Sequence, residues 1–258
     1  MLSIIVPSIR PQNWRSLWKS VEDAKIGSYE IIFVGPMDQP KYMDFFASIA
    51  NVKFVRDFGN PVRASQIGAT LAEGKYITWA ADDGVYLSNN LRCFYQAKKD
   101  DPEIDVLVAP YYEGKDQVDH GFEYYRLNGS EWTSSPKFED SWWLYNVGIM
   151  KLELFQHLGG WDSRMFETTF YAHSDMAARS QFLGHEVSFY NCPVLHCSHQ
   201  PDTTGDHAPI HHAHMGHDYE LFKKVWSDGN YVRKKIIDLD NWKKSSKVWE
   251  RRFTNVSL

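Results

Sequence analysis

Short apolar runs alternate with amphipathic segments through the first part of this chain. Continuous apolar runs that end at turn residues predict strands buried on both faces of a parallel sheet. Such runs occupy residues 2–6, 29–34, 52–55 and 76–79. Apolar residues at helical spacing predict helices between them, near residues 14–21, 42–49 and 62–72. This order of strands and helices predicts a doubly wound α/β sheet.

The second half of the chain has a less regular pattern. We expect strands at residues 106–109 and 187–190, and helices at 152–158, at 174–183 and in a segment ending at Trp226. Residues 111–145 form a long polar and aromatic stretch, which is typical of a binding loop or lid. Residues 195–217 form a loop rich in histidine. Without an internal repeat or a low-complexity linker, we expect one domain over residues 1–226 and a basic extension over 227–258.

Composition excludes some classes of function. The net charge of -5 argues against nucleic-acid binding, which needs a basic surface to displace counterions. The three cysteines form no Cys-x-x-Cys pair, which fits a reducing, cytoplasmic setting. No apolar stretch approaches membrane length, so we expect a soluble protein. The basic extension allows contact with an anionic acceptor or with lipid at the periphery of a membrane, although a solvated helix face explains it as well.

Adjacent carboxylates after the fourth predicted strand carry the strongest chemical signal. In extended chain, Asp82 and Asp83 point to opposite sides, so one can face a ribose hydroxyl and the other a divalent cation. Such a cation would stabilise the negative charge of a departing diphosphate. The alternative is a solvated Asp-Asp-Gly turn. Ligands of α/β sheets bind beyond the carboxyl ends of the strands, which places on one edge Pro7, Ser8, Arg10, Gly35, Asp82 and Asp83.

A series of short motifs resembles the nucleotide-binding half of family 2 glycosyltransferases. The motifs are residues 3–7 (SIIVP), 29–34 (YEIIFV), 63–68 (RASQIG), 72–77 (AEGKYI) and the Asp82–Asp83 pair. The resemblance resumes at residues 159–162 (GGWD) and 175–179 (DMAAR), followed by Gly184. It covers roughly two-thirds of the chain, and the order and spacing of the motifs make it specific.

The resemblance implies the GT-A fold, an α/β fold with a mainly parallel central sheet flanked by helices, and transfer with inversion at the anomeric centre. Residues 1–91 would form the nucleotide-binding half of the domain and residues 92–226 the acceptor half. Among the nucleotide-sugar-binding residues, Pro7, Ser8 and Arg10 would line the base pocket, Asp57 would bind the base, Arg63 would lie near base or phosphate, Asp82 would contact ribose, and Asp83 would bind the metal. Gly35-Pro36 stands where the family has an acidic cluster, which leaves the identity of the base open.

A second departure concerns the catalytic base. The family has a Glu-Asp pair where this chain has Ala172 and His173, and Asp175 matches a later aspartate of the motif. Histidine accepts a proton near neutral pH. Three readings stay open: His173 is the base, Asp175 is the base, or transfer activity is weak or absent. A histidine at the start of a helix with no role is the bland alternative.

The histidine-rich segment supplies further candidate ligands. GT-A enzymes often take a metal ligand from a histidine beyond the catalytic helix, and His196 has that placement, with His199 three residues later. Imidazole with carboxylate and phosphate oxygens suits Mn²⁺, and Mg²⁺ is the other candidate. A solvated loop explains these histidines equally well. Trp142, Trp143 and Trp161 fall where an acceptor would lie; each would either stack on a sugar ring or pack in the core.

These observations favour a metal-dependent, inverting glycosyltransferase that moves a sugar from a nucleotide-diphosphate donor to a glycan, lipid-linked or protein acceptor. A sugar nucleotidyltransferase is one alternative, but residues 7–11 (PSIRP) lack the Gly-rich phosphate loop that such enzymes use. A non-catalytic module that binds nucleotide-sugars or glycans is the other. The donor sugar depends on loop side chains that a sequence pattern does not resolve.

Overall fold

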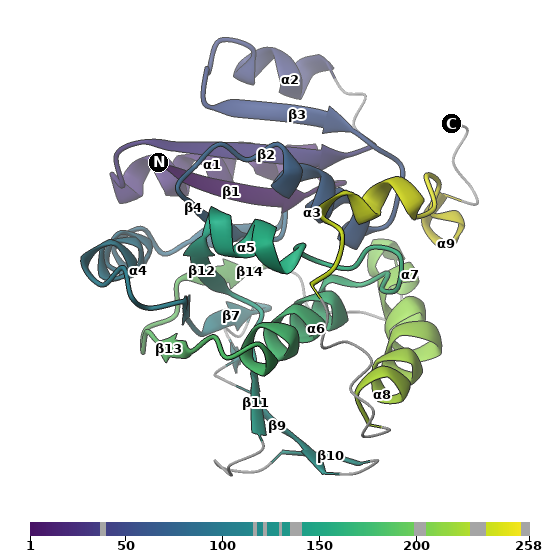
Figure 1. The fold of residues 1–258 in the computed structure, drawn as a ribbon. Helices are drawn as coiled ribbons and strands as arrows, with labels where there is room; N and C mark the ends of the chain where they lie inside the picture. Colours follow the sequence, from purple (N-terminus) through teal and green to yellow (C-terminus); the bar gives the residue numbers. More distant parts are fainter. Residues whose placement is uncertain are drawn as a thin grey trace.

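A mostly parallel sheet forms the centre of the molecule (Figure 1). The computed structural model describes residues 1–36, 40–115, 118–120, 123–128, 131–134, 141–198, 205–227 and 236–253. Within them, the central sheet has seven strands in the order β13-β6-β12-β4-β1-β2-β3. Their bounds are β1 (Leu2–Pro7), β2 (Tyr29–Gly35), β3 (Val52–Arg56), β4 (Tyr76–Trp79), β6 (Val106–Val108), β12 (Gly148–Lys151) and β13 (Val187–Phe189).

Strand direction follows the connections along the chain. Strand β1 pairs in parallel with β2 and β4, β2 with β3, and β6 with β13. Strand β12 runs antiparallel between β4 and β6. The predicted α/β fold with a mainly parallel sheet is therefore confirmed. The antiparallel β12 was not predicted, and it joins the two halves of the sheet.

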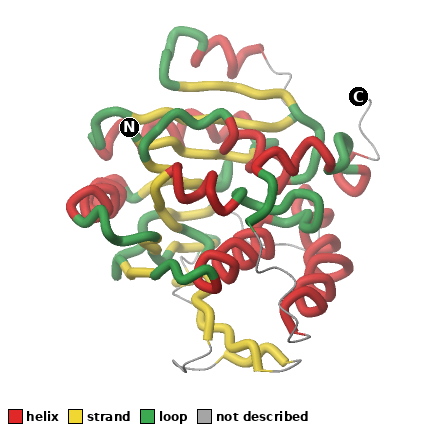
Figure 2. Tube along the Cα trace, in the orientation of Figure 1, coloured by secondary structure: helices red, strands yellow, loops and turns green. Residues whose placement is uncertain are grey.

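Helices cover both faces of this sheet, because its inner strands are apolar on both sides. Alternate residues separate two cores: Ile5 packs with α3 (Pro61–Thr70), α5 (Leu152–Leu158) and α6 (Thr169–Phe182), and its neighbour Ile4 packs with helices on the other face. The helices of that second face are α1 (Trp14–Ala24), α2 (Pro40–Phe46) and α4 (Ser88–Asp100). Figure 2 shows the same layered arrangement of helix and strand.

Two smaller sheets lie beside the central one. The first has the order β5-β14-β7-β8, with bounds Gly84–Tyr86, Leu195–Cys197, Tyr111–Glu113 and Val118–His120. It brings the end of the segment after β13 next to the chain that follows Asp83. The second is the antiparallel β10-β9-β11, with bounds Glu131–Ser134, Glu123–Asn128 and Ser141–Leu144, which extends away from the central sheet (Figure 1).

The remaining helical segments follow α6 or are single turns. They are η1 (Pro11–Asn13), η2 (Gly205–His207), α7 (Ala208–Ala213), the π-helix η3 (His214–Asp218), α8 (Tyr219–Ser227), η4 (Leu239–Lys244) and α9 (Glu250–Phe253). Residues 236–253, here named the C-terminal segment, lie against α3 and α5 (Figure 1). Asn241 and Trp249 of this segment are buried. No described helix is long and apolar enough to cross a membrane.

Several local expectations need correction. The irregular stretch expected at 111–145 contains strands, and the expected loop at 195–217 contains β14, α7 and part of η3. Helix α4 was not predicted. The helix expected from residue 174 begins at Thr169, so His173 lies in its second turn rather than at its start. The reason for the early start is a tertiary contact: the Asp218 carboxylate accepts hydrogen bonds from Thr168 N (2.7 Å) and from Glu167 N (3.1 Å), which satisfies amides at the helix N-terminus.

Candidate active site

The carboxyl ends of the first three strands are joined to one another. Ser8 N donates to Val34 O (2.8 Å), and Asp57 N donates to Gly35 O (3.0 Å). A Cβ atom placed on Gly35 would lie 1.7 Å from the Ser8 carbonyl oxygen, so only glycine allows this approach. The structure thus brings the segments after β1, β2 and β3 to one edge of the sheet, as expected. It also gives Gly35 a packing reason that the sequence did not reveal.

Asp82 anchors the chain that follows β1. Its carboxylate accepts hydrogen bonds from Ile9 N (2.7 Å), Arg10 N (2.7 Å) and Ser8 Oγ (3.1 Å), and it pairs with the Arg10 guanidinium at 2.6 Å. Ser8 Oγ in turn accepts from Trp14 Nε1 (2.6 Å). The Asp82 side chain is buried. Both of its oxygens therefore hold the loop after β1, and the ribose contact stays a prediction.

Asp57 and Arg63 form a second buried pair at this edge. Arg63 Nε lies 3.0 and 3.1 Å from the two Asp57 carboxylate oxygens. The same guanidinium donates to Trp242 O and to Ser245 Oγ (3.1 Å), and it lies 5.1 Å from the centre of the Trp242 indole ring. The pair expected at the base pocket thus also holds the C-terminal segment.

Asp83 lies at the junction of β4 with the small sheet of β5 and β14. Its carbonyl oxygen accepts from Ser198 N and Ser198 Oγ, both at 3.2 Å. Burial raises the pKa of the Cys197 thiol, and the carboxylates of Asp83, Glu113 and Asp82 raise it further. Three carboxylates therefore lie near enough to Cys197 to disfavour its thiolate.

His196 lies on the same strand as Cys197, and neighbouring side chains of a strand point to opposite faces. His196 Nε2 is 2.9 Å from Gly114 O, and the ring lies near Tyr112. His199 falls outside the described residues. Metal binding by His196 stays a prediction.

The described residues hold no group of three His, Cys, Asp or Glu side chains arranged for a metal ion. A cation held by one carboxylate and by substrate oxygens, the mode that Mg²⁺ commonly adopts, does not need such a group. Asp83 is then the protein ligand that the residues present support best. Metal binding by this chain stays a prediction.

His173 is the predicted site residue with the most distinctive surroundings. Its ring centre is 5.2 Å from that of Trp79, the last residue of β4, and 5.4 Å from that of Trp161. The side chain is almost buried, with 7% of its surface exposed. Burial lowers the pKa of His173 to about 3, so the imidazole is neutral over the physiological range. Trp79, which sequence reasoning missed, connects His173 with the strand that leads to Asp82 and Asp83; its position at the end of a buried strand was the available signal.

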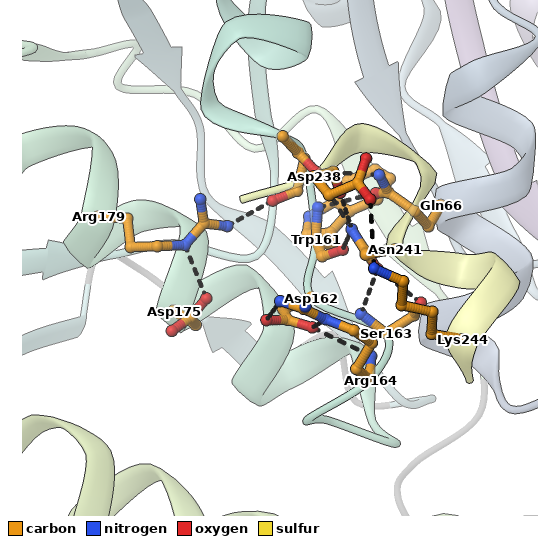
Figure 3. A network of polar contacts seen from close by, with 12 residues as sticks. Gln66, Trp161, Asp162, Ser163, Arg164, Asp175, Arg179, Asp238, Asn241 and Lys244 are labelled. Atoms are coloured by element: carbon orange, nitrogen blue, oxygen red, sulfur yellow. Dashed lines mark hydrogen bonds and ion pairs between the residues drawn. The ribbon is translucent and has the colours of Figure 1, made fainter. Parts of the chain in front are cut away.

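Asp175 has a different environment. It is fully buried, its Oδ2 accepts from Arg179 Nε (2.9 Å), and its Oδ1 accepts from Trp226 Nε1 (3.2 Å). Figure 3 shows the Arg179–Asp175 pair, and Arg179 also donates to Leu158 O (2.7 Å) and to Gly160 O. Both carboxylate oxygens of Asp175 are thus bound to other buried side chains, and its role as base stays a prediction.

Two of the three aromatic acceptor candidates, Trp161 and Trp143, pack against other side chains. Trp161 is fully buried, so its ring packs in the core and does not present a face to a sugar. The Trp143 ring packs on Phe189 at 4.3 Å, and the Trp143 amide is held by Gln181. Gln181 is eight residues beyond His173 on α6, about 12 Å along the axis at 1.5 Å per residue. Trp142 lies on β11, and its side chain is outside the described residues.

Comparison with known proteins places this architecture in a structural class. No protein-family model matches the sequence, and no curated protein matches it. Solved structures do match: the fold is that of the GT-A glycosyltransferases. The similar structures include S. aureus TarS, a family 2 GT-A glycosyltransferase.

Three crystal structures of TarS define the extent of the likeness. TarS residues 1–349 in complex with UDP has a TM-score of 0.59 and 14% identity, over 90% of this chain and 68% of that one. The same fragment with UDP-GlcNAc has a TM-score of 0.57 and 15% identity, over 98% and 73%. For the longer TarS chain the TM-score is 0.56 at 13% identity, and the match spans 41% of that chain. The shared feature is the fold.

Proposed function

We propose that this protein is an inverting, metal-dependent glycosyltransferase that uses a nucleotide-diphosphate sugar and in which His173 is the base. The observation that carries the proposal is the contact of His173 with Trp79, because it puts a neutral imidazole beside the strand that ends in Asp82 and Asp83. The fold supports it, since ligands of such sheets bind at this edge. Structures of TarS with UDP and with UDP-GlcNAc have the same fold.

In this mechanism, an acceptor hydroxyl attacks the anomeric carbon of the donor. The new C–O bond forms as the bond from that carbon to the diphosphate breaks, and the bonding electrons leave with the diphosphate. The neutral His173 imidazole takes the hydroxyl proton. Its low pKa makes it a weak base, but it keeps the imidazole unprotonated at any pH well above 3. Attack from the face opposite the leaving group inverts the anomeric centre.

Charge on the leaving diphosphate is the second requirement of the reaction. Asp83 would hold a divalent cation, Mn²⁺ or Mg²⁺, which supplies electrophilic stabilisation of that charge when bound. Arg10 and Arg63 place two guanidinium groups at the same edge of the sheet. Both are buried and paired with carboxylates, so they set the positions of the loops after β1 and β3.

The proposal allows several classes of acceptor. A glycan, a lipid-linked sugar or a protein hydroxyl fits the chemistry equally well. Contact of the basic C-terminal residues with an anionic membrane also stays a prediction, and flotation with anionic vesicles tests it. The described part of this region, the C-terminal segment, packs on α3 through Arg63 and Gln66.

The first experiment measures donor binding by thermal shift. UDP-, GDP-, CDP- and TDP-sugars are tested with and without Mn²⁺ on the wild type, on Asp83→Asn and on the matched surface control Asp100→Asn. Ligand that binds only the folded state raises the melting temperature. We expect one nucleotide class to give a metal-dependent shift that Asp83→Asn loses and Asp100→Asn keeps. A donor-induced rise in melting temperature that is the same with and without Mn²⁺ and in Asp83→Asn overturns the proposed metal dependence.

The second experiment measures turnover of the donor that binds. Release of the nucleoside diphosphate, with water or an added glycan as acceptor, should fall on the order of 10²–10⁴-fold in His173→Gln, the range of a lost general base. Donor binding should be retained. Binding without turnover in the wild type would instead identify a non-catalytic binding module.

A further inference from the structure

The backbone of Trp161 is held from two sides by side-chain amides. Trp161 N donates to Gln66 Oε1 (2.8 Å), and Trp161 O accepts from Asn241 Nδ2 (3.0 Å). Gln66 belongs to α3 and Asn241 to η4 of the C-terminal segment, so the two amides come from distant parts of the chain (Figure 3). Together they hold one polar group in each of the two peptide units that flank the Trp161 Cα atom.

Asn241 is fully buried and uses both ends of its amide. Its Oδ1 accepts from Ser163 N (2.9 Å) and Ser163 Oγ (2.7 Å). Its Nδ2 donates to Trp161 O and Asp238 O (2.8 Å), with a longer contact to Gly159 O (3.3 Å). A buried amide satisfied in this way specifies one geometry, because a lost partner leaves a polar group without water.

The loop that Asn241 holds needs such support. Gly159 and Gly160 both have positive φ values, 79° and 67°, and two successive glycines give the loop a large conformational freedom of its own. A Cβ atom on Gly159 would lie 1.9 Å from Ile237 O, so the C-terminal segment lies directly against this glycine. The position of the loop is therefore decided by the segment that packs on it.

The loop in turn positions the ring of Trp161. That ring meets Trp79 at 5.3 Å and Phe155 at 4.7 Å, both edge to face, and the imidazole of His173 at 5.4 Å. Trp79 contacts both rings, so the two indoles and the imidazole form one cluster with ring centres 5.2, 5.3 and 5.4 Å apart. A shift of the Trp161 backbone would move one indole of this cluster and admit water to the imidazole.

We infer that Asn241 is a positioning residue of the active site, which acts through the Trp161 backbone to hold the indole ring against His173. Gln66 completes the same support from α3. The C-terminal segment is then part of the catalytic unit and not an appendage to it. The catalytic side of this inference rests on the proposed function, whereas the structural side, the control of His173 by Asn241, does not.

Two substitutions of the same network separate positioning from stability. Asn241→Asp keeps an acceptor for Ser163 but removes the donor to Trp161 O. Ser163→Ala removes the 2.7 Å bond to Asn241 Oδ1 and leaves the Trp161 contact in place. Asn241→Asp also removes the donor to Asp238 O and to Gly159 O, whereas Ser163→Ala removes the Oγ bond alone, so the melting temperature of each variant is measured to report its own structural cost.

The direct readout is NMR titration of the His173 imidazole, assigned by comparison with His173→Gln. Among the described residues, burial is the cause of its low pKa. We expect Asn241→Asp to raise this pKa by a unit or more and Ser163→Ala to leave it within a few tenths. An unchanged His173 titration in a folded Asn241→Asp protein overturns the inference, and so does an equal change in both variants.

Turnover gives the second readout. In donor hydrolysis we expect Asn241→Asp to lower kcat at least tenfold with the donor KM within twofold of the wild type, and Ser163→Ala to keep kcat within twofold. A kcat that follows the melting temperature in both variants would show a merely structural role. If His173→Gln retains full turnover, the proposed function fails, while the NMR comparison still decides the positioning role.

Discussion

Replacing Arg179 with methionine removes the guanidinium that neutralises the Asp175 carboxylate in the protein interior. Both side chains are fully buried and 2.9 Å apart. The same change takes the donors away from Leu158 O and Gly160 O, next to the loop that carries Trp161. We therefore expect a large loss of stability from a single side chain that is remote from solvent.

The magnitude follows from the cost of an unpaired buried charge. Breaking a buried ion pair by removing one partner costs about 3–5 kcal/mol, against a total stability of about 5–15 kcal/mol. In a chain of this size each kcal/mol corresponds to about 2–4 °C in melting temperature, so the fall should be about 6–20 °C. Removing both charges in the double variant Asp175→Leu/Arg179→Met should recover the part of the loss that comes from the unpaired carboxylate, but not the part from Leu158 O and Gly160 O, which still lack the Arg179 donors.

Urea unfolding of the wild type, of Arg179→Met and of the double variant measures these differences. A loss below about 1 kcal/mol in the single variant, or a double variant as unstable as the single one, would refute the reasoning. The double variant also tests the roles of the two candidate bases. If Asp175 is structural, the double variant should keep donor turnover within about tenfold at a temperature where it is folded, whereas His173→Gln should not.

Three further predictions concern the same edge of the molecule. The pKa of His173 is about 3 in the folded state and 6.5 ordinarily, so below pH 6.5 the unfolded chain binds the proton first and stability falls as the pH falls. Urea unfolding at pH 4.5, two units below the ordinary pKa, and at pH 7 measures the effect. Between these pH values the free energy of unfolding should fall by about 2–3 kcal/mol more in the wild type than in His173→Gln, and equal losses would contradict the low pKa. Gly35→Ala should abolish the donor-induced thermal shift and cost about 1–3 kcal/mol, because its Cβ would meet Ser8 O at 1.7 Å; unchanged donor binding would show that the loop yields. Trp242→Ala should reduce the free energy of unfolding by at least about 0.5–2 kcal/mol, the range of its contact with the Arg63 guanidinium, and so lower the melting temperature. An unchanged melting temperature in scanning fluorimetry would contradict that contact.

Local patterns were sufficient for the strand framework. The apolar runs predicted β1, β2, β3 and β4 to within a residue or two, because a strand buried on both faces must be apolar at every position. The rule for parallel sheets then placed the segments at Ser8, Gly35 and Asp82 on one edge, and the structure has them there. The fold and the meeting of these segments at one edge of the sheet could thus be predicted from the sequence.

The sequence did not reveal which groups the charged residues bind. Asp82, expected to contact ribose, also holds the loop after β1, and Asp175, a candidate base, also pairs with Arg179 and Trp226. The sequence presents these carboxylates alike, as acidic residues in a family motif. Burial and the identity of the partner decide whether a carboxylate is a ligand or a structural ion, and both depend on packing.

By itself, the sequence determined the alternation of elements, the edge at which the strands end and the unusual histidine at position 173. Only the tertiary structure decided that His173 packs against two indole rings and that the C-terminal segment supports one of them. The contact of Asn241 with Trp161 spans 80 residues, and that of Arg63 with Ser245 spans 182. Hydrophobic periodicity reports the faces of single helices and strands, and so it carries no information on which distant side chains meet.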